Sequence, residues 1–112
     1  MLNFDLQTEQ EGNAALISVR GDLDIQVAER VADALTEAES TEADLLVLDL
    51  SGLTFLDSTG MGVIAAAHVR AIDASRRFVI VRPPTGVRQA FELSGLDEVV
   101  TIVDELATVY PP

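Results

Sequence analysis

The sequence predicts an α/β fold in which helices pack on a mixed β-sheet of about five strands. Residues 45–50, LLVLDL, form an almost continuous apolar run, which is typical of a strand buried on both faces in a parallel sheet. Segments with strand and helix patterning follow one another in the order β-β-α-β-α-β-α-β. Because helices separate the later strands, we expect parallel strand pairs covered by helices.

The first part of the chain is predicted to form a hairpin and then a helix. Residues 2–6 alternate between apolar and polar side chains, and the polar turn that follows at residues 10–13 contains Gly12. Residues 15–20 form the second strand, which Gly21 closes. A loop at residues 21–24 then leads into the next segment.

The helix after this loop is expected at residues 25–39, because its apolar residues form one stripe at helical spacing. Asp24 precedes it and is a candidate N-cap. Strand 45–50 follows, then a turn that Phe55 and Leu56 anchor in the core. The next helix is predicted from Ser58 to about residue 75. Its apolar positions are Met61, Ile64, Ala65 and Ile72.

The last part of the chain contains two further strands, at residues 78–81 and 99–103. Between them lies a third helix, which Thr85 is expected to cap and Gly95 to end, with Leu96 making the hydrophobic contact that follows such an end. Residues 104–110 are expected to add one or two helical turns.

Composition restricts the function classes. The chain has 112 residues, enough for one domain with its own core. It has no cysteine, no apolar run long enough to span a membrane and no basic signal region at its start, so we expect a soluble cytoplasmic protein without cofactor or metal. The net charge of −12, with only arginines as basic residues, disfavours nucleic acid and anionic membranes. That acidity either favours a partner with a basic face or only maintains solubility.

Ser58 lies where a helix starts, just beyond the carboxyl end of the central strand. At such a position a serine caps backbone N–H groups, or accepts a phosphate that the helix N-terminus tolerates. A catalytic role for Ser58 would need a base. The only histidine, His68, lies ten residues further along the same predicted helix, or about 15 Å away at the standard rise.

Other enzyme motifs are incomplete as well. A nucleophile elbow would need glycine where Leu56 stands, and a P-loop would need a lysine, which the chain lacks. Asp57 occurs in an aspartic-protease-like motif that is present once and contains the extra residue Thr59 before Gly60. We therefore predict no catalytic residue and no enzymatic activity.

Three stretches resemble the STAS domains of bacterial anti-sigma-factor antagonists. They are LVLDLSGLTFLDSTGMGVI, GDLD at residues 21–24 and VRQAFELSGLDEV at residues 87–99, and together they extend over nearly the whole chain. The resemblance implies that Ser58 is phosphorylated by a partner anti-sigma factor, itself an ATP-dependent serine kinase. It implies that the unphosphorylated form binds this kinase and releases a sigma factor. The C-terminal end of the chain, YPP, is short for this family. The sequence therefore does not decide whether the family's last helix is present.

The loop at residues 21–24 and the start of the Ser58 helix should lie at the same end of the sheet, where open α/β folds place their binding sites. By resemblance they contact the kinase, and a serine phosphatase acts on phosphorylated Ser58. The expected partner-binding residues are Gly21, Asp22, Asp24, Asp57, Ser58, Thr59, Gly60 and Met61. We expect a monomer or weak dimer. A STAS module of a larger stress-signalling scaffold and an esterase-like enzyme using Ser58 remain the alternatives.

Several residues allow two interpretations. Asp24 is either a helix cap or a kinase contact, and Asp57 either shapes its loop or contacts the partner. Asp49 is expected to accept hydrogen bonds from nearby backbone N–H groups, since a bare buried carboxylate is costly. Gly60 and Gly62 either admit a partner's backbone or pack against the sheet.

Overall fold

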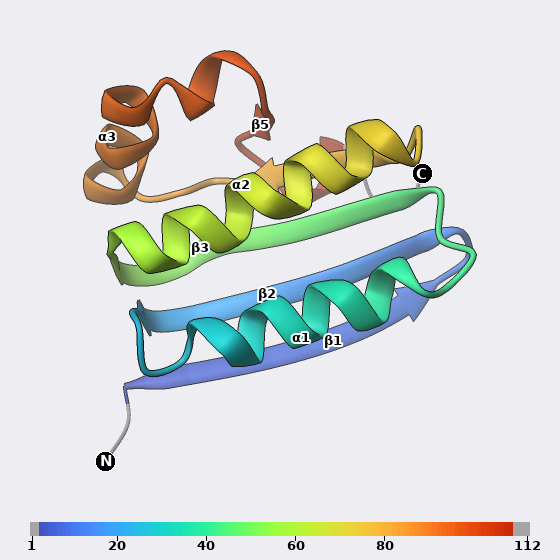
Figure 1. Cartoon of the computed structure of the whole chain (residues 1–112), viewed down its shortest axis with the longest axis horizontal. Helices are drawn as coiled ribbons and strands as arrows, with labels where there is room; N and C mark the ends of the chain where they lie inside the picture. Colours follow the sequence, from blue (N-terminus) through green and yellow to red (C-terminus); the bar gives the residue numbers. More distant parts are fainter. Residues whose placement is uncertain (1–2, 109–112) are drawn as a thin grey trace.

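Three helices lie over one face of a five-stranded sheet in the computed structural model, which describes residues 3–108 (Figure 1). The strands, in their spatial order, are β1 (Phe4–Glu11), β2 (Ala14–Leu23), β3 (Leu45–Leu56), β4 (Arg77–Val81) and β5 (Thr101–Val103). β1 is antiparallel to β2, and all other neighbours are parallel. The helices are α1 (Ala28–Glu39), α2 (Ser58–Asp73) and α3 (Thr85–Ser94). The predicted mixed α/β fold is confirmed.

The central strand β3 is buried on both faces, as its apolar run predicts. Leu48 is 0% exposed and lies in register between Ile17 of β2 and Ile80 of β4. On the same face, Leu46 belongs to a core cluster that includes buried residues of all three helices. Val47 faces the other side, where a smaller cluster comprises Ala14, Leu16, Leu45, Val47, Val79 and Val81, with Val103 and Leu106 against it.

The first two strands are longer than predicted. β1 continues to Glu11 because the hairpin extends to an exposed edge, where polar side chains occupy both faces and the alternating pattern disappears. β2 continues through Gly21, which has a φ of +88° and is paired with Phe4. A Cβ atom on Gly21 would collide with the carbonyl oxygen of Asn3. Gly21 therefore lies within β2, where its backbone conformation produces a local irregularity. The prediction that the strand ends at Gly21 is wrong.

β3 likewise continues beyond the predicted turn, to Leu56. Its register against β2 shifts twice, between the pairs of Ser18 and Arg20 and again between those of Gly21 and Asp22, which is the signature of β-bulges. At the first shift the Asp49 carboxylate accepts a hydrogen bond of 3.0 Å from Ser51 N. Asp49 thus binds a backbone N–H as predicted, at a bulge inside the strand.

The helix starts differ from the predictions in how they are capped. α1 begins at Ala28, and Val27 rather than Asp24 is its N-cap residue. Pro84 rather than Thr85 occupies the N-cap position of α3, which has no side-chain cap. At the other end of α3, Gly95 adopts the predicted left-handed conformation with a φ of 78°, and Leu96 is buried.

Two further predictions are wrong, namely the burial of Ile72 and the start of the last strand. Ile72 of α2 is 62% exposed, because the helix turns Gly60, Ile64, Ala67 and Ala71 toward the sheet. A stripe made partly of small residues is harder to recognise than one of large apolar residues. The last strand starts at Thr101, after a 3-10 turn at Leu96–Glu98. Of the predicted helical turns at residues 104–110, Leu106–Thr108 form a 3-10 turn, Asp104 and Glu105 are not helical, and residues 109–110 lie outside the described residues.

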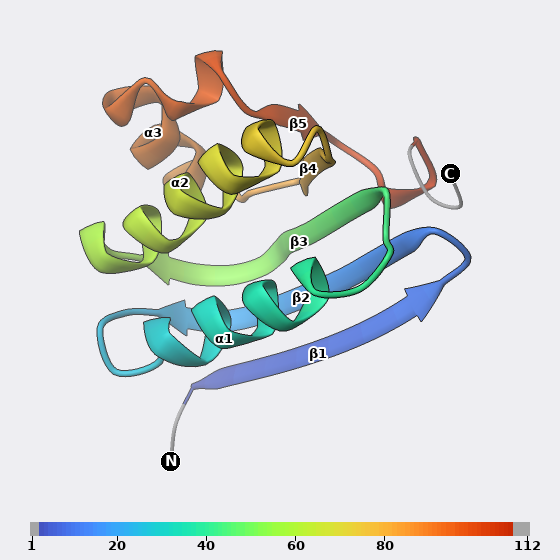
Figure 2. The same cartoon turned by 45° about the vertical axis from the view of Figure 1, so that its right-hand side comes forward.

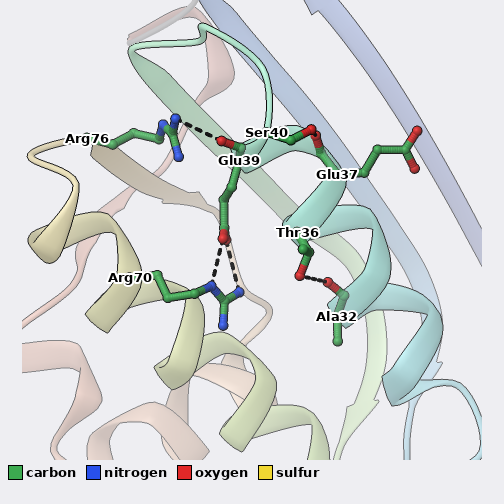
Figure 3. A network of polar contacts seen from close by, with 7 residues as sticks. All are labelled: Ala32, Thr36, Glu37, Glu39, Ser40, Arg70 and Arg76. Carbon is green, nitrogen blue, oxygen red and sulfur yellow. Dashed lines mark hydrogen bonds and ion pairs between the residues drawn. The ribbon is translucent and has the colours of Figure 1, made fainter.

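Two arginines connect α2 and the segment after it to the end of α1 (Figure 3). Arg70 donates two hydrogen bonds to the Glu39 carboxylate, at 2.7 and 2.9 Å, and these bonds raise the pKa of Arg70 above its ordinary value. Arg76 donates to the carbonyl oxygens of Ala43 and Glu39, at 2.8 and 3.1 Å. The second arginine thereby satisfies a carbonyl that the end of α1 leaves free. Together they fix α2 beside α1.

Candidate functional site

The candidate site lies at the end of the sheet where β2 and β3 finish and where α1 and α2 begin, on the left of Figure 2. The loop after β2 and the start of α2 meet there, as expected for loops at the carboxyl ends of neighbouring parallel strands. The segments 22–26 and 54–60 therefore form one surface, although some 30 residues separate them in the chain.

Asp57 holds these two segments together. Its Oδ1 atom accepts a hydrogen bond of 2.9 Å from Gly60 N, which makes Asp57 the N-cap of α2. Its Oδ2 atom accepts a hydrogen bond of 3.1 Å from Ile25 N in the loop after β2. In addition, Asp57 N donates to the carbonyl oxygen of Leu23 at 3.3 Å. The interpretation of Asp57 as a residue that shapes its loop is confirmed.

Ser58 is the first residue of α2 and is exposed. The suggestion that it is the N-cap is wrong, because Asp57 occupies that position and its carboxylate reaches Gly60 N. Within residues 3–108 the Ser58 hydroxyl forms no hydrogen bond. It is thus presented to solvent at the positive end of a helix, next to a carboxylate. Thr59, beside it, is also exposed.

Two aspartates fix the end of β2 and the loop after it. Asp24 Oδ1 accepts a hydrogen bond of 3.0 Å from Gln26 N, and its carbonyl oxygen accepts from Val27 N and Ala28 N at 3.1 and 2.9 Å. Asp24 therefore closes the turn that precedes α1, in place of the predicted helix cap. Asp22 Oδ1 accepts a hydrogen bond of 2.6 Å from the Thr54 hydroxyl, which ties β2 to the end of β3.

The remaining predicted site residues divide by exposure. Gly21 and Gly60 are buried, so they shape the surface from beneath. Met61 is half-buried against the core. The polar rim of the site is thus made by Asp22, Asp24 and Asp57 together with the hydroxyls of Ser58 and Thr59, and segments 22–26 and 54–60 contain no basic residue.

Sequence reasoning missed two apolar residues at this end of the sheet. Ile25 is 73% exposed and Phe55 is 51% exposed, although Phe55 was expected to anchor its loop in the core. Leu56 is the residue that takes this anchoring role, since it is half-buried against the core. Phe55 instead borders a recess of about 280 Å³ between the end of β3 and the start of α3. Because β3 is bulged near this end, the alternation of side chains along the sequence does not indicate whether an apolar residue there is exposed.

Gly60 and Gly62 differ sharply in their surroundings, which yields a testable prediction. A Cβ atom on Gly60 would lie 2.9 Å from the carbonyl oxygen of Leu23 and 2.7 Å from Leu56 Cδ1, whereas a Cβ atom on Gly62 would project into open space. We expect Gly60→Ala to destabilise the fold by about 1–3 kcal/mol through overpacking. Gly62→Ala should instead stabilise it by up to about 1 kcal/mol, because alanine favours the helix. Urea unfolding measures both, and equal stability of the two variants would contradict this packing.

Comparison with known protein families identifies the family to which this chain belongs. Residues 5–109 match the STAS domain. The chain belongs to the STAS domain family. The predicted family resemblance is therefore confirmed.

Relatives of this STAS domain include anti-sigma-factor antagonists. The anti-sigma-F factor antagonist RsfB of Mycobacterium tuberculosis is 30% identical over 82% of this chain and 75% of its own length. The anti-sigma-B factor antagonist of Listeria monocytogenes is 29% identical over 77% of this chain and 75% of its own length.

Solved structures share the fold. An anti-sigma factor antagonist from Mycobacterium paratuberculosis aligns with a TM-score of 0.85 and 25% identity, over 94% of this chain and 89% of that chain. The Bacillus cell fate determinant SpoIIAA in its phosphorylated form aligns with a TM-score of 0.74 and 21% identity, over 94% of this chain and 96% of that chain. The STAS domain has no helix, among those that the structure describes, that is long and apolar enough to cross a membrane.

Proposed function

We propose that this STAS domain is a cytoplasmic anti-sigma-factor antagonist. In its unphosphorylated form it binds a kinase-type anti-sigma factor and so releases the sigma factor. The anti-sigma factor phosphorylates Ser58 with ATP, which ends the interaction, and a serine phosphatase restores the active form. The observation that carries this proposal is the exposed, unbonded Ser58 hydroxyl at the first residue of α2, on a surface that Asp57 assembles from two loops.

Three features support this proposal. The relatives named above are antagonists of anti-sigma factors. A kinase can reach Ser58 without unfolding the chain, because the side chain is exposed and its hydroxyl forms no hydrogen bond within residues 3–108. The contact surface we propose consists of Asp22, Asp24, Asp57, Ser58, Thr59 and Met61, and its carboxylates suit a partner with a basic face.

The proposal is tested with the unphosphorylated protein and the kinase-type anti-sigma factors of its own organism. We expect one of them to bind in calorimetry and to release its sigma factor as the STAS domain is added. With ATP present, the wild-type protein should lose this effect over time, because Ser58 becomes phosphorylated. Ser58→Ala should bind as well as wild type and keep the sigma factor released.

The controls separate the role of Ser58 from that of its neighbour. Thr59→Ala removes the adjacent exposed hydroxyl, and it should still be inactivated by ATP as wild type is. If no kinase-type anti-sigma factor binds the unphosphorylated protein, the proposed function is wrong. If ATP inactivates Ser58→Ala as fast as wild type, the switch lies at another residue.

A further inference from the structure

An apolar surface adjoins Ser58 on the side of α3. The recess of about 280 Å³ is bordered by Leu53, Thr54, Phe55 and Leu56 of β3 and by Pro84, Gly86 and Val87 at the start of α3. Phe55 exposes half of its side chain there. Large apolar side chains held at the surface next to a concave, partly apolar recess are typical of the anchor points of protein interfaces.

Two carboxylates of the site lie next to this recess, since Asp22 accepts a hydrogen bond from Thr54, which borders it, and Asp57 directly follows Leu56. Segments 22–26 and 54–60 contain Asp22, Asp24 and Asp57 and no basic residue, and of the two arginines that flank the start of α3, Arg88 is paired with Asp104. A second copy of this chain, with its net charge of −12, would bring like charge to this rim. The rim therefore favours a partner that brings basic side chains around an apolar one.

We propose that Phe55 and the recess beside it are the apolar anchor of the anti-sigma-factor interface, with Ile25 as a second contact across Ser58. This inference rests on the proposed function and extends its surface from the two loops to the start of α3. The partner inserts an apolar side chain into the recess and places basic side chains against Asp22 and Asp24. Asp57 is a positioning residue in this arrangement, because its carboxylate accepts the hydrogen bond from Ile25 N and so orients the turn that presents the Ile25 side chain.

Continuity with Ser58 explains why one phosphate would suffice to disrupt this larger surface. Leu56, which borders the recess, also packs against the position of Gly60 in the first turn of α2. Ser58 therefore starts the helix that Leu56 packs against, and Asp57 next to it accepts a hydrogen bond from Ile25 N in the loop after β2. A phosphate there would have to be buried between two contacts that the partner makes at the same time.

The experiment compares binding of the unphosphorylated wild type and of three variants to the anti-sigma factor, by calorimetry. Phe55→Ala should weaken binding by about tenfold or more, as truncation of an interface anchor does. Ile25→Ala should weaken it less, because a smaller side chain is lost. Leu93→Ala removes an equally apolar side chain, 90% exposed, near the other end of α3 and should bind as wild type does. Thermal melting should show all three variants folded, since each side chain is at least half exposed.

The charge of the rim is tested separately with Asp24→Asn, which keeps an oxygen acceptor for Gln26 N. This variant should bind more weakly at low salt and show a smaller loss of affinity as salt is added. Phe55→Ala that binds as tightly as wild type overturns the inference while the proposed function stands. Failure of the wild type itself to bind overturns both. If sedimentation shows that the wild type is a homodimer and that Phe55→Ala dissociates it without weakening binding of the anti-sigma factor, the surface serves self-association. The inference is then likewise wrong.

Discussion

Phosphorylation of Ser58 is expected to end binding of the anti-sigma factor and to leave the domain folded. A phosphate adds about −1.5 to −2 charges at neutral pH. Ser58 lies in the first turn of α2, at the positive end of the helix, where a negative charge is stabilising or neutral for the fold. The Gly60 N–H is not available to the phosphate, because Asp57 Oδ1 already accepts its hydrogen bond at 2.9 Å.

The same phosphate would be unfavourable in the interface. It would add to the charge of Asp57 next to it, and the partner would have to desolvate both groups on docking. The loss therefore arises in the complex, since the Ser58 side chain is exposed and lies outside the core. Ser58→Asp should weaken binding only partly, because a carboxylate carries less charge and fewer acceptor oxygens than a phosphate.

The decisive measurement pairs calorimetric binding with thermal melting on the unmodified and the phosphorylated protein. Binding should disappear while the melting temperature changes little. Mass spectrometry should locate the phosphate on Ser58 and leave Thr59, the neighbouring exposed hydroxyl, unmodified. Undiminished binding of the phosphoprotein, or a collapse of its melting temperature, would rule out a switch that acts through the interface.

The sheet could be predicted from the sequence wherever the pattern of apolar side chains indicates burial. Residues 45–50 are apolar on both alternating faces, and the strand they form is buried on both faces. The rest of that strand was missed because Ser51, Gly52 and Thr54 are turn-forming or polar residues, which two β-bulges accommodate within β3. A bulge changes which face a residue occupies, so Phe55 was assigned to the core although it is half exposed.

The candidate site was located by sequence, but its internal contacts were not. Asp57 and Ser58 are both common N-cap residues, and only the geometry shows that Asp57 takes this role. The hydrogen bond between Asp57 and Ile25 N joins residues 32 positions apart. Local periodicity carries no information on such a contact, because it depends on how β2 and β3 align in the sheet.

The replacement Leu48→Ala is expected to cost about 2–5 kcal/mol of the free energy of unfolding. Leu48 is 0% exposed on the central strand, and its β-sheet neighbours Ile17 and Ile80 are equally buried. The lost side chain therefore leaves a cavity enclosed by two strands and the helices above them, which the rigid sheet can close only in part. The cost combines the lost transfer free energy with the energy of that cavity.

Leu93→Ala provides a matched control for this replacement, because it makes the same chemical change at a side chain that is 90% exposed. It should change stability by less than about 0.5 kcal/mol, as surface substitutions usually do. Urea unfolding of wild type and both variants, with comparison of midpoints and slopes, measures the two effects side by side. A cost for Leu48→Ala well under 1 kcal/mol, or one equal to that of Leu93→Ala, would mean that the sheet does not depend on β3. In that case the positions of Asp57 and Ser58, which follow directly from the end of this strand, would need another support.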